Sequence, residues 1–181
     1  MKNICVIGSG ISGSTIANLL SKKYKVDVYE KAKGIGGRSS HRRYLNKLGF
    51  DHGLQYISPK TSKFEKFCSR LQKKRVLKKW QGPHKFDHSK VLENKKHTKL
   101  IGAKGNNAIS KYLLKNINCI FGYELSKIER IRKNWKLSFL NGDVKYYEIL
   151  VISIPFAQSK KLLKKFLPNF FKNKKVKMEA N

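Results

Sequence analysis

Three glycines near the N-terminus, Gly8, Gly10 and Gly13, are spaced as G-x-G-x-x-G, and an acidic residue, Glu30, follows them. Glycines at these positions allow a tight turn and let the backbone approach a pyrophosphate, which the free N–H groups at a helix start attract. A carboxylate such as Glu30 can accept hydrogen bonds from both hydroxyls of an adenosine ribose. The pattern predicts a dinucleotide-binding site. The alternative is that the glycines serve an ordinary turn between a strand and a helix.

The residues around these glycines predict the elements that would hold them in place. Residues 3–7 form a short apolar run rich in β-branched side chains, which is typical of a strand buried on both faces. Apolar residues then recur with helical spacing, and lysines suit the end of this helix at residues 21–23. Residues 26–29 predict a second strand, which Glu30 closes. In this order of strand, turn, helix, strand and acid, Gly13 lets helix and strand pack closely.

A second glycine-rich turn follows in the segment KGIGGRSS at residues 33–40. Gly36 and Gly37 allow the backbone to turn near a cofactor, and Arg38 can place a fixed cation against its pyrophosphate. NAD dehydrogenases do not generally follow their acidic residue with this arrangement, whereas many FAD enzymes do. The segment therefore indicates the second half of the nucleotide site and favours FAD over NAD.

Together these motifs resemble one family. The segments VIGSGISG, VYEKAKGIGGRSSHRR, FDHGLQYIS, IGAKGNNAISKYL and ILVISIP are similar, in order and spacing, to the renalase-like FAD-dependent oxidoreductases, relatives of the flavin amine oxidases. The similarity covers nearly the whole chain. One departure is Leu54, because the family usually has a small residue before Gln55. A Leu54 side chain that pointed at the cofactor would crowd the flavin side of this loop.

The resemblance implies which residues contact FAD. It implies that both glycine turns contact the cofactor, as do the acidic residue, the lysine after it and a Gln-Tyr pair. It also implies that the strand near residue 125 offers its backbone to adenine. The expected contacts are Gly8, Ser9, Gly10, Ile11, Ser12, Gly13, Glu30, Lys31, Gly37, Arg38, Gln55, Tyr56 and Leu125. No catalytic acid or base is assigned, because the substrate-lining half of the family fold is mostly missing from the sequence.

Several polar and aromatic residues near these motifs have two interpretations. Tyr56 is either a core aromatic or a neighbour of the flavin, and the motif favours the second. His41, Arg42 and Arg43 are interpreted as solvated loop residues rather than cofactor contacts. His52 is interpreted as a polar loop residue in the same way.

The expected fold class is α/β. The resemblance implies a Rossmann-like FAD-binding domain of the glutathione-reductase type, a parallel sheet with helices, into which a β-rich portion of a substrate domain is inserted. We expect residues 1–58 and 101–167 to form the FAD/NAD(P)-binding domain, residues 59–100 the partial insertion and residues 168–181 a basic tail. Members of the family continue well past this point, so we expect an N-terminal part of the fold, incomplete at its C-terminus.

Local patterns predict the remaining elements. An amphipathic helix with its N-cap near Thr61 is expected at residues 61–77. Asn141 and Gly142 form a strong hairpin signal, and the apolar run at residues 149–154 is expected to return to the parallel sheet. Further predictions are irregular or edge-strand structure at residues 80–100, a short helix from about residue 107, strands at residues 119–121, 123–132, 135–140 and 144–147, and a helix at residues 156–166.

The 181 residues include 41 Lys and Arg against 11 Asp and Glu, which gives a formal net charge of +30. Such a charge attracts nucleic acid and anionic membranes nonspecifically. The excess is nearly all lysine scattered from end to end, which favours biased codon usage over a designed binding face. No helix-turn-helix, aromatic RNA-binding pattern or arginine cluster occurs, so we expect no specific nucleic-acid partner. No apolar run reaches about 18 residues, so we expect no membrane span.

Cys5, Cys68 and Cys119 are odd in number, far apart and without C-x-x-C spacing. This pattern favours reduced thiols and a cytoplasmic location over a disulfide framework. Cys5 falls among apolar strand residues and is expected in the core. His84 and His88 lie close together and invite a metal hypothesis, but the sequence offers no third ligand within reach. We therefore expect no metal site.

Three functions follow from these observations. The leading hypothesis is an FAD-dependent oxidoreductase of renalase or amine-oxidase type, in which an amine or a dihydronicotinamide-like small molecule gives hydride to the flavin. The second is a noncatalytic remnant, or a split subunit that needs a separate C-terminal partner chain. The third is a basic protein that binds nucleic acid nonspecifically.

Overall fold

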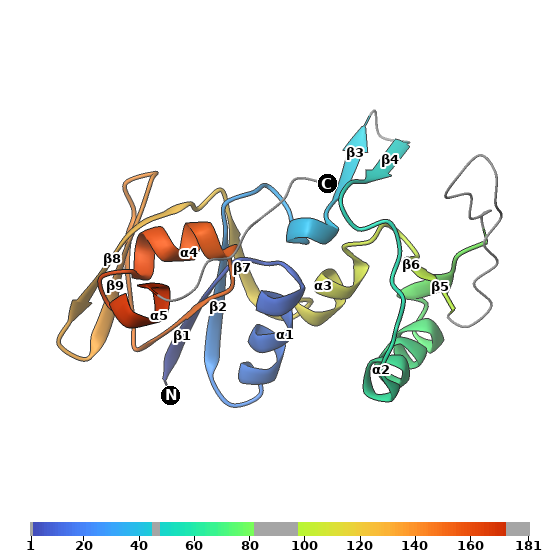
Figure 1. Ribbon diagram of the computed structural model, residues 1–181, viewed down its shortest axis with the longest axis horizontal. Coiled ribbons are helices and arrows are strands. Elements are labelled where there is room, and N and C mark those ends of the chain that lie inside the picture. The colour runs from blue at the N-terminus through green and yellow to red at the C-terminus, as the bar shows by residue number, and fades with distance from the viewer. Residues whose placement is uncertain (1, 45–47, 82–97, 173–181) are drawn as a thin grey trace. The chain divides into compact units, whose positions relative to one another are not determined.

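The computed structural model describes residues 2–44, 48–81 and 98–172. The chain divides into two compact units, of which the first combines Met1–Ile35 with Leu113–Asn181 and the second is Gly36–Tyr112. Figure 1 shows the elements of both units in the colours of the sequence.

The compact units divide the chain elsewhere than the sequence predicted. The predicted breaks lay after residue 58 and before residue 101, whereas the units change after residue 35 and after residue 112. One contact crosses a predicted boundary, from the predicted FAD/NAD(P)-binding segment to the predicted insertion. Ile57 and Leu100 each donate their N–H to the other's carbonyl, at 2.7 and 2.8 Å. The assignment of these segments to a cofactor domain and a substrate domain stays a prediction.

The first unit is built on a parallel sheet with the strand order β11-β1-β2-β7. Helix α1 is the crossover that parallel neighbours such as β1 and β2 require (Figure 1). The predicted order of strand, glycine turn, helix and strand is confirmed, and so is the return of the late apolar run to this sheet. The elements are β1 (Asn3–Ile7), α1 (Ile11–Leu20), β2 (Lys25–Glu30), β7 (Asn118–Phe121) and β11 (Ile149–Ile152).

Alternate residues of β1 and β2 face opposite sides of this sheet, as the pleat of a strand requires. On one face, four aliphatic side chains pack with Ala17 of α1; on the other, Cys5, Ile7 and Tyr29 enter a second hydrophobic cluster. Burial on both faces explains why the strands read as continuous apolar runs. The expectation that Cys5 is a core residue is confirmed. The four aliphatic residues are Ile4, Val6, Val26 and Val28.

A three-stranded antiparallel sheet, in the order β10-β9-β8, supplies the other side of the second cluster. Its strands are β8 (Leu125–Ile131), β9 (Asn134–Phe139) and β10 (Val144–Tyr147). The turn between β9 and β10 contains Gly142, whose φ is +88°, and the Asn141 side chain accepts the N–H of Asp143 at 3.2 Å. The predicted hairpin at Asn141 and Gly142 is therefore confirmed.

Helices α4 (Phe156–Leu163) and α5 (Pro168–Lys172) follow in the first unit. Helix α4 is shorter than the predicted range of 156–166, and its Leu162 and Leu163 pack on the second cluster. The predicted basic tail at residues 168–181 begins with helix α5. Proline suits a first helical position, because the N–H that it lacks would have no helical partner there. The Phe171 ring is buried, with its centroid 5.5 Å from that of Phe156.

The second unit consists of short elements within its described residues. The segment that was interpreted as a solvated loop at residues 41–43 is instead a strand, since His41 pairs with Asp51 across an antiparallel ladder. Arg42 and Arg43 are exposed, as expected. The elements are the 3-10 helix η1 (Gly37–Ser39), β3 (His41–Tyr44), β4 (Leu48–Asp51), α2 (Ser62–Lys73), β5 (Leu77–Lys79) and β6 (Leu100–Gly102), and α3 (Ala108–Leu113) follows.

Helix α2 begins where the sequence predicted and ends earlier. The Thr61 side chain accepts the N–H of Phe64 at 3.4 Å, which confirms the predicted N-cap. The helix was expected to run to residue 77. It stops at Lys73, because Arg75 takes a positive φ of 56° and Leu77 enters strand β5.

A polar network, buried at its two tyrosine hydroxyls, joins the parallel sheet to the antiparallel one. The Tyr147 hydroxyl of β10 donates to Asp27 Oδ2 of β2 at 2.8 Å and lies 2.9 Å from the Tyr29 hydroxyl. Asn118 of β7 donates its side-chain N–H to Asp27 Oδ1 at 2.7 Å. Burial, followed by the contacts with Tyr29 and Asp27, raises the pKa of Tyr147, and burial raises the pKa of Tyr29. The fold therefore stabilises the protonated tyrosines.

Removing the Tyr147 hydroxyl tests this network. Tyr147→Phe should lower the free energy of unfolding by about 1–3 kcal/mol at neutral pH, because Asp27 and Tyr29 lose a buried hydrogen-bond partner. The raised pKa of folded Tyr147 makes its contribution complete below the ordinary pKa of 10.0, and the contribution is lost as the pH rises toward the folded-state value. Wild type should therefore lose stability above this pH more steeply than the variant. Urea denaturation of both proteins at pH values below and above 10.0 measures the difference in stability.

Tyr146→Phe is the matched control, since Tyr146 lies next to Tyr147 on β10 and its side chain is 55% exposed. This variant should unfold at the wild-type urea concentration. Equal losses in the two variants would contradict a stabilising role for the buried hydroxyl.

Candidate functional site

The first glycine turn connects β1 to α1 and is closed by backbone contacts. Gly8 has a φ of +100°, and its N–H donates to the Tyr29 carbonyl at 2.8 Å. A Cβ on Gly13 would overlap the carbonyl oxygen of Gly8, so no side chain fits where α1 passes this turn. Ser153, just after β11, stabilises the turn: its hydroxyl donates to Ile7 O at 2.8 Å and lies 3.1 Å from Gly8 O. Sequence reasoning did not identify Ser153.

Helix α1 presents its N-terminus at this turn. Its N-cap is Gly10, which is extended and has no side chain to cap the first N–H groups. Ile11 and Ser12 are exposed, whereas the Ser14 hydroxyl turns inward and donates to Gly10 O at 2.8 Å. N–H groups at the start of a helix are suited to donate to a phosphate, and the helix dipole favours the negative charge.

Glu30 ends β2 with its carboxylate turned toward the same glycine turn. The residue is 9% exposed, and its Oε2 accepts hydrogen bonds from the Ser9 N–H at 2.9 Å and the Ser9 hydroxyl at 2.7 Å. Its Oε1 accepts the N–H of Ala32 at 3.0 Å. The contact between Ser9 and Glu30 was not foreseen, since the sequence predicted Ser9 only as a cofactor contact. Three donors thus fix the position of the acidic group.

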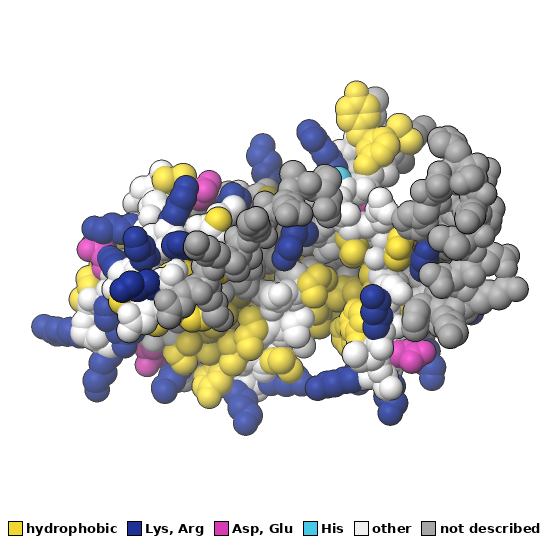
Figure 2. Space-filling view, in the orientation of Figure 1, with side chains coloured by type: hydrophobic (Ala, Val, Ile, Leu, Met, Phe, Trp, Pro, Cys, Tyr) yellow, Lys and Arg dark blue, Asp and Glu magenta, His cyan; other side chains and the backbone are white. Residues whose placement is uncertain are grey.

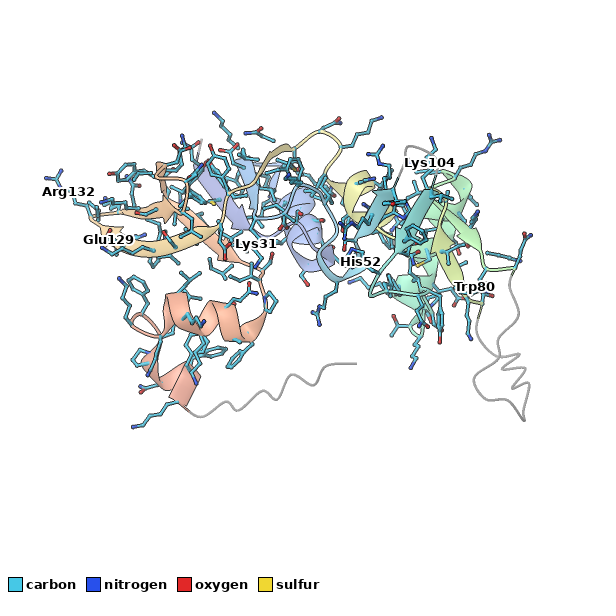
Figure 3. All side chains as sticks on the ribbon, turned by 90° about the horizontal axis from the view of Figure 1, so that it is seen from above. Lys31, His52, Trp80, Lys104, Glu129 and Arg132 are labelled. Atoms are coloured by element: carbon cyan, nitrogen blue, oxygen red, sulfur yellow. The ribbon has the colours of Figure 1, made fainter. Side chains whose placement is uncertain are left out.

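A cavity of about 400 Å³ lies beside Glu30 in the first unit. Gly8, Glu30, Lys31 and Leu125 line it together, so the structure gathers these four predicted residues from three separate segments. Lys161 of α4 lines it as well and was not identified from the sequence. Lys31, labelled in Figure 3, is exposed, and its Nζ lies 3.9 Å from the exposed Glu124 carboxylate.

The remaining predicted residues lie in the second unit, where the structure brings the Arg38 turn next to the Gln-Tyr turn. The Arg38 carbonyl accepts the N–H of Leu54 at 3.0 Å, and a Cβ on Gly53 would overlap that carbonyl. The Arg38 side chain is exposed. Gln55 accepts a hydrogen bond through its carbonyl, from Asn106 Nδ2 at 3.1 Å.

Tyr56 is half-buried and makes contacts of its own in the second unit. Its ring lies edge-on to Trp80, with centroids 5.9 Å apart, and the Lys99 ammonium lies 4.5 Å from its centroid. His52, labelled with Trp80 in Figure 3, lies 3.0 Å through Nε2 from the Ser40 hydroxyl. Contact of Tyr56 and its neighbours with a cofactor stays a prediction.

His84 and His88 lie outside the described residues. The residues that the structure does describe hold no cluster of three His, Cys, Asp or Glu side chains suited to a metal, and no helix among them is long and apolar enough to cross a membrane. All three cysteines are described, and they are free thiols. Figure 2 shows Lys and Arg spread over the visible face rather than gathered in one stripe.

A parallel sheet, a glycine turn that opens a helix, and a carboxylate at the end of the second strand define a Rossmann-like dinucleotide-binding fold. Residues 6–71 match the family of NAD(P)-binding Rossmann-like domains. Renalase of Mus musculus is 25% identical over 169 residues, which cover 87% of this chain and 48% of renalase. The chain thus spans about half the length of this relative. The predicted resemblance to renalase is confirmed.

Solved structures support the fold. A protein assigned as a protoporphyrinogen oxidase, from Exiguobacterium sp. 255-15, superposes with a TM-score of 0.69 at 11% identity, over 94% of this chain and 63% of that chain. The tetracycline destructase Tet(51) superposes with a TM-score of 0.60 at 14% identity, over 90% of this chain and 41% of that chain. At such identities the similarity shows the fold, and the predicted α/β class with a Rossmann-like parallel sheet is confirmed.

Gly13→Ala tests the close packing of α1 on the glycine turn. The added methyl group must displace the Gly8 carbonyl, so we expect the free energy of unfolding to fall by about 1–3 kcal/mol. The shifted helix start should also weaken ADP binding by about tenfold or more. Urea denaturation and calorimetric titration with ADP measure the two effects.

Thr15→Ala is the control, because Thr15 lies on α1 outside the expected cofactor contacts and its exposed hydroxyl donates to the Ile11 carbonyl of the same helix at 2.7 Å. It should retain wild-type stability and ADP affinity. A Gly13→Ala protein that binds ADP as tightly as the control would show that this turn does not hold a nucleotide.

Proposed function

We propose that this chain is an FAD-dependent oxidoreductase of the renalase or amine-oxidase type. In this proposal, hydride passes from an amine or a dihydronicotinamide-like small molecule to the flavin. The observation that carries it is the buried Glu30 carboxylate, tied to the glycine turn and lining a cavity with Leu125. The similarity to mouse renalase supports the reaction class.

The residues present fit the adenosine and pyrophosphate part of FAD. A carboxylate has about four lone-pair positions, and Ser9 and Ala32 occupy three of those of Glu30. A ribose hydroxyl can take the remaining position or replace the Ser9 hydroxyl. The start of α1 offers N–H groups to the pyrophosphate, and Leu125 lines the same cavity as Glu30, where its backbone can meet adenine.

The second glycine turn supports FAD rather than NAD. Gly36 and Gly37 have positive φ angles of 137° and 55°, so the turn suggested by the motif is formed. It leaves the Arg38 guanidinium exposed, as a cation that binds a phosphate must be. Gly37, Arg38, Gln55 and Tyr56 are accordingly proposed as cofactor contacts alongside those of the first unit.

Bound flavin would supply the hydride acceptor. The chain's own contribution is binding and orientation: Glu30 orients the ribose, the start of α1 and Arg38 stabilise the pyrophosphate charge, and no residue is assigned as a catalytic acid or base. The alternatives to this proposal are a split subunit, in which a separate chain supplies the substrate half, and a noncatalytic remnant. The free thiols support a cytoplasmic location.

Identification of the bound nucleotide tests the proposal directly. Purified protein should release FAD on denaturation, or take up added FAD if purified without it, and substrate amines or dihydronicotinamides should then bleach the flavin absorbance. Chromatography of the released ligand and anaerobic spectra are the measurements. Tight binding of NAD with no affinity for FAD would contradict the proposal.

Glu30→Gln tests the role of the carboxylate. Hydrogen bonds to a charged group contribute about 1.5–3 kcal/mol, so ADP and FAD should each bind about tenfold to a hundredfold more weakly. Glu129→Gln is the control: its carboxylate forms partly exposed ion pairs with Lys127 and Lys136, at 3.1 and 3.6 Å, and is not among the residues that line the cavity. Calorimetry should show unchanged affinity for the control. Equal affinities for both variants would remove Glu30 from the site.

A further inference from the structure

Asn106 lies in the loop between β6 and α3 of the second unit and is 1% exposed. Its side-chain oxygen accepts the N–H of Gly102 at 2.9 Å. Its side-chain nitrogen donates to the carbonyls of Leu54 and Gln55, at 2.6 and 3.1 Å. Its backbone N–H donates to Asp51 Oδ1 at 2.7 Å. A buried amide with both N–H groups and its oxygen engaged is costly to replace, because each lost partner leaves a buried polar group unsatisfied.

These hydrogen bonds hold one particular turn from both sides. The Leu54 N–H donates to the Arg38 carbonyl at 3.0 Å, while the Leu54 carbonyl accepts from Asn106. Leu54 therefore connects Arg38 to Asn106 through its own peptide groups, and Gln55 is tied to the same amide. Of the residues that the proposed function assigns to FAD in this unit, Gln55 is thus bonded to Asn106 directly and Arg38 is linked to it through Leu54.

A histidine secures the other end of the turn. Asp51 Oδ1, which accepts the Asn106 N–H, also lies 2.9 Å from His41 Nδ1. The His41 ring fits against Gly49 and Gly105, since a Cβ on either glycine would overlap it. Asp51 is thereby fixed between β3 and the Asn106 loop, and the turn at residues 52–56 starts from a fixed point.

We propose that Asn106 is a positioning residue for the cofactor: it holds the turn of Gln55 and Tyr56 at a fixed position relative to Arg38. This inference rests on the proposed function. An Asp at this position has nearly the same shape, but its carboxylate faces the carbonyl oxygens of Leu54 and Gln55 with no hydrogen to donate. Repulsion between these oxygens must then open the turn.

The test compares FAD with ADP binding to the full chain. ADP lacks the flavin end, so the affinity lost through Gln55 and Tyr56 appears in FAD binding alone. For Asn106→Asp, the ratio of FAD to ADP affinity should fall by about tenfold. Asn106→Ala removes the donors without adding a charge and should shift the ratio in the same direction. It replaces the Asp variant in the test if that variant does not fold. Calorimetry and quenching of flavin fluorescence give the two affinities.

Leu71→Ala is the matched control for stability, because Leu71 is a buried core residue of the same unit, 1% exposed, on α2. It should destabilise the protein while leaving the affinity ratio unchanged. An unchanged ratio in both Asn106 variants, or an equal shift in Leu71→Ala, would overturn the inference while FAD binding by wild type still stands. Wild type that binds neither ligand would instead overturn the proposed function, and the inference with it.

Discussion

The hydrogen bonds between Glu30 and Ser9 are the interaction on which the rest of the nucleotide site depends. A buried carboxylate is costly unless donors surround it. Glu30 obtains two of its donors from the turn after β1 and the third from Ala32, directly after β2. The ends of these two strands must therefore stay together. This arrangement places the glycine turn, the start of α1 and the cavity beside one another, with the acidic group already oriented.

Packing of the parallel sheet makes that arrangement rigid. Helix α1 covers one face through Ala17, and the antiparallel sheet covers the other through a cluster that includes Ile128 and Leu137. Gly13 allows the helix to approach so closely that even a methyl group would strike the turn. The Tyr147–Asp27 contact adds a polar link between the sheets, whose burial favours the protonated phenol. Apolar packing supplies the driving force, and the polar contacts set the register.

The second unit uses the same physical principle with a different residue. Its turns contain little regular structure, so their backbone groups need partners from elsewhere in the chain. Asn106 supplies several of these partners from a single buried amide. In both units a buried polar side chain, satisfied by backbone groups of distant segments, gives a loop a defined position.

The sequence by itself determined the local features of this protein. The order of strand, glycine turn, helix and acid, the Thr61 N-cap and the Asn141-Gly142 hairpin each follow from side-chain periodicity or from backbone angles that few residues adopt. It did not reveal that Ser9 holds Glu30, that Ser153 braces Gly8 or that Asn106 holds the Leu54 turn. These partners are 21, 145 and 52 positions apart. Tertiary structure decided these contacts, because packing alone brings such distant residues within hydrogen-bond range, where burial then makes each contact obligatory.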